Sequence, residues 1–202
     1  AQTMGEYGTA AILSDLRTDP TVAVPASRTS AWSFDPDVLE SGANYCVEGI
    51  NAVDYARTTG TVRSIMSIHL PGEYGDDGAA GVKLATSLNS ITFINAKTDP
   101  GADRQDGAAD AIIARRPDVV ILATTPAETE VIVRKAAEGG YRGRIIGAGP
   151  TWDQALLRGP AAAALKASYV RMTPWGPWNA DTPGHRAMRA ALGSLAPQDG
   201  HV

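Results

Sequence analysis

The chain has 202 residues, of which 44% are hydrophobic and 20% are charged, and its 18 Lys and Arg against 22 Asp and Glu give a net charge of −4. This composition is typical of a folded globular protein and excludes collagen-like, coiled-coil and disordered chains. A negative chain without a cluster of basic residues has little to offer a nucleic acid or an anionic membrane surface, so we expect neither as a partner.

The apolar runs are short, and none is longer than Val119 to Ala123, whereas a transmembrane helix needs about 20 apolar residues. We therefore expect no direct insertion into a membrane. The chain begins at Ala1 without the charged start and apolar stretch of a secretory signal, so a signal is either absent or already removed. The single cysteine, Cys46, can form no internal disulfide, and one thiol does not make a zinc site.

The first 60 residues contain few strand patterns. Helices are predicted over residues 8–16 and 44–57, and a strand over residues 21–24. One strand cannot close a sheet, because a sheet needs neighbours on which to form its hydrogen bonds. The first 60 residues therefore lack enough strands to close a sheet alone.

From residue 61 onward, short apolar runs alternate with amphipathic segments. Strands are predicted over residues 65–70, 91–94, 119–123, 144–148 and 169–172, and helices over residues 76–88, 103–115, 126–138 and 185–192. The run at 119–123 is apolar throughout, as expected of a strand covered by helices on both faces. Alternating strands and helices with short connections indicate an α/β fold with a doubly wound parallel sheet.

Helix-capping residues follow two of these strands. Thr125, Pro126 and Glu128 make a capping box with proline at the first helical position, and Thr151 and Gln154 repeat the cap and its partner. Asp76 or Asp77 is expected to cap the helix over residues 76–88, which Gly78 and Gly81 weaken.

Ligands of open parallel sheets bind beyond the carboxyl ends of the strands. Three loops, over residues 71–76, 124–127 and 149–152, meet that condition, and they bring Tyr74, Thr124, Thr125, Thr151 and Trp152 toward one edge. These side chains can hydrogen-bond and stack, but none is a strong nucleophile. Capping alone would also explain Thr125 and Thr151, and packing at the edge would also explain Tyr74 and Trp152.

Motifs of catalysis are missing: the sequence contains no G-x-S-x-G elbow, phosphate-binding loop or dinucleotide fingerprint. The three histidines, His69, His185 and His201, have no acid at a metal-ligand spacing. We therefore expect no catalytic residue, no metal and no cofactor, and we interpret His69 as a hydrogen-bonded residue at a strand end. An α/β enzyme that uses His69, Tyr74 and Asp76 as an acid–base set remains an alternative.

A succession of short motifs points to a family. They are residues 24–30 (VPASRTS), 73–78 (EYGDDG), 116–120 (RPDVV), 136–141 (AAEGGY) and 146–147 (IG). In this order they resemble type I periplasmic binding proteins, in particular the branched-chain amino acid (Leu/Ile/Val) substrate-binding proteins of ABC transporters. The resemblance covers roughly residues 21–192, and the opening strand–helix units of the family are missing, so the chain resembles a partial member.

The resemblance implies two lobes that close on a small ligand. From the first lobe, Ser27, Thr29 and Ser30 would hold its carboxylate or ammonium; from the second, Tyr74 would cover it and Thr125 would line the wall. Residues 150–152 stand where the family often has an acid for the ammonium, and here no acid stands there. This favours a carboxylate, amide or aromatic ligand. Stacking could come from Trp32, Trp152, Trp175 and Trp178.

The implied organisation is residues 1–60 as part of lobe 1, residues 61–174 as lobe 2, and residues 175–202 as a crossover and return to lobe 1. The implied function is an extracytoplasmic solute-binding protein, periplasmic or anchored at the cell surface, that works without catalysis beside an ABC permease. A ligand-sensing regulatory domain of the same fold is the first alternative.

Overall fold

The computed structural model describes residues 2–3, 5–19, 21–174, 176 and 179–193. The chain forms two units, Ala1–Met172 and Thr173–Val202. Among the described residues of the second unit there is one helix, α7 (Pro183–Leu192), which Thr182 caps. None of the described helices combines the length and the apolar character that a membrane span requires.

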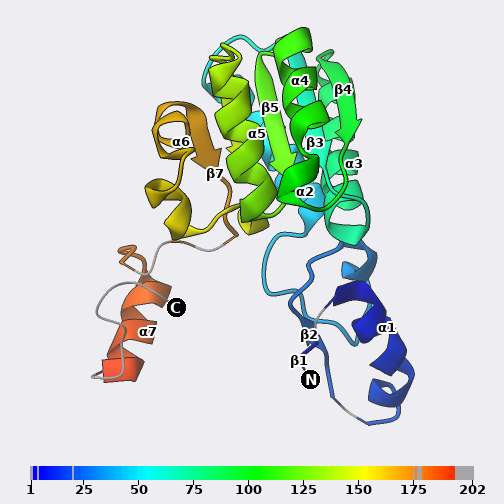
Figure 1. The fold of residues 1–202 in the computed structure, drawn as a ribbon. Helices are drawn as coiled ribbons and strands as arrows, with labels where there is room; N and C mark the ends of the chain where they lie inside the picture. Colours follow the sequence, from blue (N-terminus) through cyan, green and yellow to red (C-terminus); the bar gives the residue numbers. More distant parts are fainter. Residues whose placement is uncertain (1, 4, 20, 175, 177–178, 194–202) are drawn as a thin grey trace. The chain divides into compact units, whose positions relative to one another are not determined.

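A parallel sheet of five strands forms the centre of the first unit (Figure 1). In spatial order its strands are β4 (Thr92–Lys97), β3 (Ser64–His69), β5 (Val119–Ala123), β6 (Arg144–Gly147) and β7 (Tyr169–Arg171). Every neighbouring pair is parallel. The doubly wound α/β class is thereby confirmed, and each strand overlaps a predicted apolar run.

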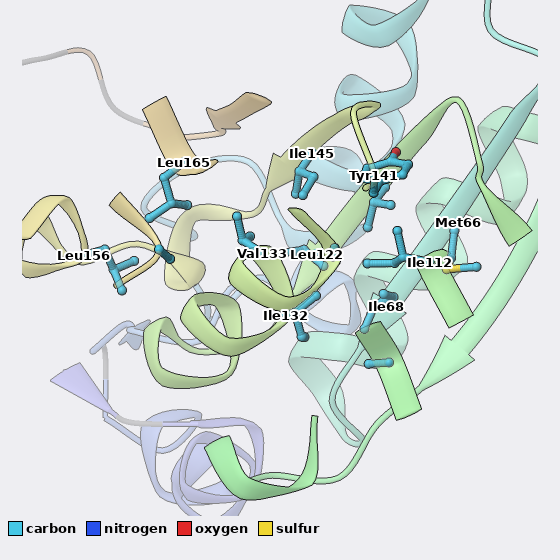
Figure 2. Packing of buried hydrophobic residues seen from close by; sticks show 14 residues of the cluster. Met66, Ile68, Ile112, Leu122, Ile132, Val133, Tyr141, Ile145, Leu156 and Leu165 are labelled. Atoms are coloured by element: carbon cyan, nitrogen blue, oxygen red, sulfur yellow. The ribbon is translucent and has the colours of Figure 1, made fainter. Parts of the chain in front are cut away.

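Helices cover both faces of this sheet. Successive side chains of each strand point to opposite faces, so each face has its own apolar core. On one face Met66, Ile68, Val120 and Leu122 pack with α4 (Asp106–Arg115), α5 (Pro126–Glu138) and α6 (Ala162–Ser168); Figure 2 shows this cluster. On the other face Ile65, Val119, Ile121 and Ile146 pack with α2 (Tyr45–Thr58) and α3 (Glu73–Leu88). The uniform burial of β5 follows from this double cover.

Helix α2 lies with the sheet. Sequence patterns place residues 44–57 within the first lobe, whereas the buried side chains Ala52, Val53 and Ala56 of α2 belong to the core beneath the sheet. We propose that the second lobe begins at this helix rather than at residue 61. The predicted limit after residue 174 lies close to the division between the two units, which falls after Met172.

The first residues form a second, smaller sheet. Strands β1 (Gln2–Thr3) and β2 (Val24–Pro25) pair in parallel, with helix α1 (Gly5–Leu16) between them in the chain. The predicted strand at 21–24 is thus shorter and later than expected, with Ala23 making one isolated bridge to Val38. A 3-10 turn, η1 (Ser30–Trp32), follows β2.

Two helix starts differ from prediction. Helix α3 begins at Glu73, its N-cap is Gly72 with φ of 97°, and no side chain caps it. Asp76 instead accepts the Gly72 N–H at 3.0 Å from within the helix. Helix α4 begins at Asp106, because a 3-10 turn, η2 (Ala102–Arg104), occupies the residues before it.

The predicted repeat of the capping box at Thr151 is wrong. Thr151 ends a 3-10 turn, η3 (Gly149–Thr151), and the next turn, η4 (Gln154–Arg158), is capped by Asp153, whose carboxylate accepts the Ala155 N–H at 2.7 Å. The first capping box, at Thr125 and Glu128, is present as predicted.

Candidate functional site

The order of the strands creates a switch point between β3 and β5. From β3 the chain passes to β4 on one side, and then returns to β5 on the other side. Loops that leave the two central strands in opposite directions open a crevice at their carboxyl ends, which is where ligands of such sheets bind. Thr124 follows β5 directly, Tyr74 lies in the first turn of α3, which follows β3, and the Tyr74 hydroxyl donates to the Thr124 carbonyl at 3.2 Å.

Two tyrosines pack together near this edge of the sheet. The rings of Tyr45, in the first turn of α2, and Tyr74, in the first turn of α3, meet edge to face with centroids 4.9 Å apart. Burial, and then the nearby carboxylate of Glu48, raise the pKa of Tyr74 well above its ordinary value. Tyr74 therefore stays a neutral hydrogen-bond donor at physiological pH.

A small cavity of about 10 Å³ lies between α2, α3 and the sheet. Such a volume is at the lower limit for one water molecule. Its lining includes Tyr45, Glu48, Tyr74, Ala123 and Ala148. The cavity therefore touches the ends of two central strands and the first turns of two helices.

A buried ion pair joins the loop after β2 to α2. Arg28 Nη1 and Glu48 Oε1 are 3.0 Å apart, and the two side chains are only 4% and 5% exposed. The guanidinium also lies 5.1 Å from the ring centre of Tyr45, in a position for a cation–π interaction. Sequence reasoning missed both residues, although an arginine between Ser27 and Thr29 is a charge inside the motif that carries the resemblance.

The loop after β6 reaches the same ion pair. A Cβ placed on Gly149 would lie 3.4 Å from Arg28 Nη2 and 3.5 Å from Glu48 Oε1. Because these are ordinary contact distances, the backbone at Gly149 lies directly against the pair. The structure thus brings the loops after β2 and β6 to one place, beside a cavity that the end of β5 also lines.

The three predicted residues of the first loop have different surroundings. Ser27 and Thr29 are buried, and Thr29 Oγ1 accepts the Ala31 N–H at 3.5 Å as the cap of η1. Ser30 is fixed by Asp77 of α3, which accepts its N–H at 2.9 Å and its hydroxyl at 2.5 Å. Asp77 also accepts the Cys46 N–H at 3.1 Å, so this carboxylate holds the loop against the start of α2.

The threonines after β5 form hydrogen bonds with side chains of the first turn of α5. Thr124 is fully buried and its hydroxyl bonds that of Thr129 at 2.8 Å. Thr125 is exposed, and both its N–H, at 3.0 Å, and its hydroxyl donate to Glu128. Glu128 also accepts the Gly101 N–H at 2.9 Å. Although burial raises the pKa of Glu128, these hydrogen bonds outweigh it and lower the pKa below its ordinary value.

Thr151 and Trp152 meet Tyr169 of β7. The Thr151 and Tyr169 hydroxyls are 2.5 Å apart, and the Trp152 ring stacks on that of Tyr169 with centroids 5.7 Å apart. Burial raises the pKa of Tyr169 to about 12. Trp32 is buried in η1, whereas Trp175 and Trp178 lie outside the described residues.

His69 is hydrogen-bonded at the end of its strand, as the sequence interpretation has it. Its Nδ1 lies 3.0 Å from the Leu70 carbonyl and its Nε2 lies 3.1 Å from Asn95 Oδ1. Asp76 lies 3.3 Å from Nδ1 and pairs with Lys97 at 2.6 Å. The Tyr74 hydroxyl, bonded to Thr124, is engaged elsewhere. In the described part of the chain, no three His, Cys, Asp or Glu side chains gather as a metal site.

A wider hollow lies at the opposite edge of the sheet. Its volume is about 320 Å³, and it is lined by residues that precede or begin β6 and β7, among them Arg142, Arg144 and Lys166. Arg144 donates to the carbonyls of Ala56 and Thr59 at 3.2 and 3.3 Å, which makes it a support for the end of α2. The amino ends of parallel strands lack the converging loops of the carboxyl edge.

Comparison with known proteins gives the chain a family. The family model described as periplasmic binding protein matches residues 2–201. A search of curated protein sequences found no match.

Solved structures share the fold at low sequence identity. A fatty acid ABC transporter substrate-binding protein from Thermomonospora curvata has a TM-score of 0.83 at 20% identity, with 98% of this chain and 52% of that chain covered. A branched-chain amino acid ABC transporter protein from Thermus thermophilus with bound valine has a TM-score of 0.78 at 14% identity, with 98% and 52% covered. A leucine-binding protein from Thermotoga maritima has a TM-score of 0.78 at 13% identity, with 95% and 56% covered. The chain therefore spans about half the length of these proteins.

Proposed function

Because the chain belongs to the periplasmic binding protein family, we propose that it is part of an extracytoplasmic solute-binding protein of an ABC transporter. In this proposal the protein captures a small ligand between two lobes and catalyses no reaction. The permease of the transporter recognises the closed form. Ligand binding and closure of the lobes are coupled, because a ligand that contacts both lobes binds the closed state more tightly than the open state.

The observation that carries this proposal is the convergence of loops on the Arg28–Glu48 pair. The loop after β2 supplies Arg28, the loop after β6 lies against both side chains at Gly149, and Tyr74 lies on the cavity that Glu48 lines. Polar groups that converge at the carboxyl edge of a parallel sheet are what a small-molecule site requires.

The proposed ligand-binding residues lie on both sides of this point. Ser27, Thr29 and Ser30 act from the loop after β2, with Ser30 held in place by Asp77. Tyr74, Thr124, Thr125, Thr151 and Trp152 act from the edge of the five-stranded sheet. A guanidinium matches the geometry of a carboxylate, and the solved structures named above include a fatty acid transporter protein and one with bound valine. We therefore propose a ligand that carries a carboxylate.

The test measures binding by calorimetry with one probe for each ligand class: L-leucine, 4-methylpentanoate, isobutyramide and L-phenylalanine. At least one probe is expected to bind and to raise the melting temperature with concentration, because a ligand of the folded state stabilises it. The Tyr74→Leu substitution is expected to weaken that binding at least tenfold, or about 1.4 kcal/mol.

The matched control is Tyr55→Leu, which removes an exposed tyrosine of α2 and is expected to leave the affinity unchanged. Equal effects of the two substitutions, or no binding of any probe, would contradict the proposal. Turnover of a bound probe that is lost in His69→Asn would favour the enzyme alternative.

A further inference from the structure

We propose that the hollow at the amino ends of β6 and β7 is a second binding site, which takes a phosphate group, as the free anion or at the end of a lipid. Residues 142–144 and 166–170 line this hollow. It lies at the edge of the sheet opposite the proposed ligand site, so the inference goes beyond the proposed function and does not depend on it.

Three cations gather in the hollow. Arg142 and Arg144 come from the turn and the start of β6, and Lys166 comes from the last turn of α6. The sequence shows no basic cluster, because these residues lie far apart along the chain. The pairing of β6 with β7 brings the two segments together.

No carboxylate balances these cations among the residues that the structure describes. The ion pairs there involve other side chains, and no acid lines the hollow. Asp118, an acid at the same edge of the sheet, uses its Oδ2 to accept the N–H groups of Arg63 and Ser64. In a chain with a net charge of −4, the hollow is therefore a place where positive charge is concentrated.

Helix ends balance only part of this charge. Arg142 donates to the Ala137 carbonyl near the end of α5 at 2.8 Å, and Arg144 donates to the Ala56 carbonyl near the end of α2 at 3.2 Å. Lys166 stands at the end of α6. The C-terminal end of a helix carries about half a negative charge, so these ends offset about half of the positive charge of the three side chains. The remainder attracts an anion.

The two guanidinium groups are held in place for a ligand. Arg142 Nη1 donates to two carbonyls at 2.8 Å, and Arg144 donates to two carbonyls at 3.2 and 3.3 Å. Because a guanidinium has five N–H donors, each side chain keeps donors that these carbonyls do not use. A guanidinium matches two oxygens of a phosphate group, and a side chain that is already fixed loses little freedom on binding.

The size and charge of the hollow favour a phosphate group. Its volume of about 320 Å³ lies within the range of about 300–1,000 Å³ that is typical of small-molecule sites. A terminal phosphate group carries about −1.5 to −2 charges at pH 7, whereas a carboxylate carries one. Since electrostatic attraction grows with charge, a cluster of cations binds the phosphate group more tightly.

The test measures binding of inorganic phosphate to the 202-residue chain by calorimetry at constant ionic strength, with chloride as the competing anion. Phosphate is expected to bind, and the double change Arg142→Gln with Lys166→Gln is expected to weaken it at least tenfold. Arg144 is kept because it supports the end of α2. The control is Lys83→Gln with Arg104→Gln, which removes two exposed cations outside the hollow and is expected to leave the affinity unchanged.

A second measurement distinguishes the two sources of the phosphate group. It follows cosedimentation of the chain with phosphatidylcholine vesicles that contain phosphatidic acid, and with vesicles of phosphatidylcholine alone. Cosedimentation that needs phosphatidic acid and is lost in the double change of Arg142 and Lys166 would support the inference with a lipid as the source. Binding of inorganic phosphate without cosedimentation would support it with a soluble molecule as the source.

Two outcomes would overturn the inference. One is equal weakening of phosphate binding by the two double changes, because it indicates a response to net charge alone. The other is binding of neither inorganic phosphate nor the vesicles, which leaves the proposed function standing. If circular dichroism shows the Arg142 and Lys166 double change unfolded, Lys166→Glu alters one exposed side chain and is expected to weaken phosphate binding at least tenfold.

Discussion

Asp118 fastens the starts of two neighbouring strands. Its Oδ2 accepts the N–H groups of Arg63 at 2.7 Å and Ser64 at 3.0 Å, and its own N–H donates to Ser64 Oγ at 3.1 Å. The hydrogen bond from the Arg63 N–H is the main cause that lowers the pKa of Asp118 below 3.8, and the Ser64 bonds act in the same direction against the effect of burial. This carboxylate therefore fixes the register of β3 against β5 from one end.

Asp118→Asn is expected to reduce the free energy of unfolding by about 1–2 kcal/mol at pH 7, as for hydrogen bonds to a charged group. A lowered pKa in the folded state means that the ionised group stabilises the fold above its ordinary pKa of 3.8 and that this contribution disappears as the pH falls through the folded value. Urea unfolding is expected to show that Asp118→Asn lowers the free energy of unfolding by less at pH 3 than at pH 7.

The control is Asp54→Asn, at an exposed pair with Arg57 on α2, which is expected to change stability by less than about 0.5 kcal/mol. If Asp118→Asn lowers the free energy of unfolding equally at both pH values, the negative charge of Asp118 does not account for its contribution to stability.

Local chemistry explains which single residues could be predicted. The capping box of Thr125 and Glu128 needs only residues three apart, and it is present. Thr151 has the same local pattern, but its hydroxyl bonds the Ala148 carbonyl and the hydroxyl of Tyr169, a partner that β7 brings from outside the segment. The Arg28–Glu48 pair joins residues from different elements, so no local pattern contains it.

The contact of α2 with α3 depends on glycine. A Cβ on Gly81 would lie 2.0 Å from the Cys46 carbonyl oxygen, and a Cβ on Gly49 would lie 2.3 Å from the Gly78 carbonyl oxygen. The backbones of the two helices therefore touch, and only glycine permits this approach. The sequence pattern treats Gly78 and Gly81 as a weakness of the helix, whereas the packing supplies the reason for Gly81.

Gly81→Ala is expected to destabilise the protein by about 1–3 kcal/mol, because overpacking at a rigid backbone outweighs the helix propensity of alanine. Gly107→Ala in α4 is the matched control, since a Cβ there would meet nothing within 4 Å. That change is expected to stabilise by about 0.5–1 kcal/mol. Thermal unfolding of both variants gives the comparison, and equal shifts of one sign would refute the packing argument.

Strands were more predictable than helix starts, again for a physical reason. A buried parallel strand favours a continuous apolar run, which β5 shows throughout, whereas Ser67 interrupts the apolar residues of β3. The start of α3 depends on Gly72 with its positive φ and on Asp77 being committed to Ser30 and Cys46. Those contacts join distant residues, so the acids at 76 and 77 were mistaken for caps.

At the scale of the whole molecule, the strand order β4-β3-β5-β6-β7 places a switch point between β3 and β5, and the carboxyl edge there is where we propose that the ligand binds. Alternating patterns suffice to predict a parallel sheet and its carboxyl edge. Such patterns do not show that α2 covers the sheet, because the apolar face of an amphipathic helix does not identify the surface against which it packs. The limits of the lobes drawn from the sequence therefore leave this helix in the first lobe, whereas we propose that it belongs to the second.

Hydrogen–deuterium exchange with the tightest-binding of the four probes tests the central claim, that the ligand is held at the carboxyl edge of the five-stranded sheet. On addition of the probe, amide exchange is expected to slow in residues 26–30, 72–76, 124–127 and 148–152. Slower exchange confined to the opposite edge, around Arg142, Arg144 and Lys166, would contradict it.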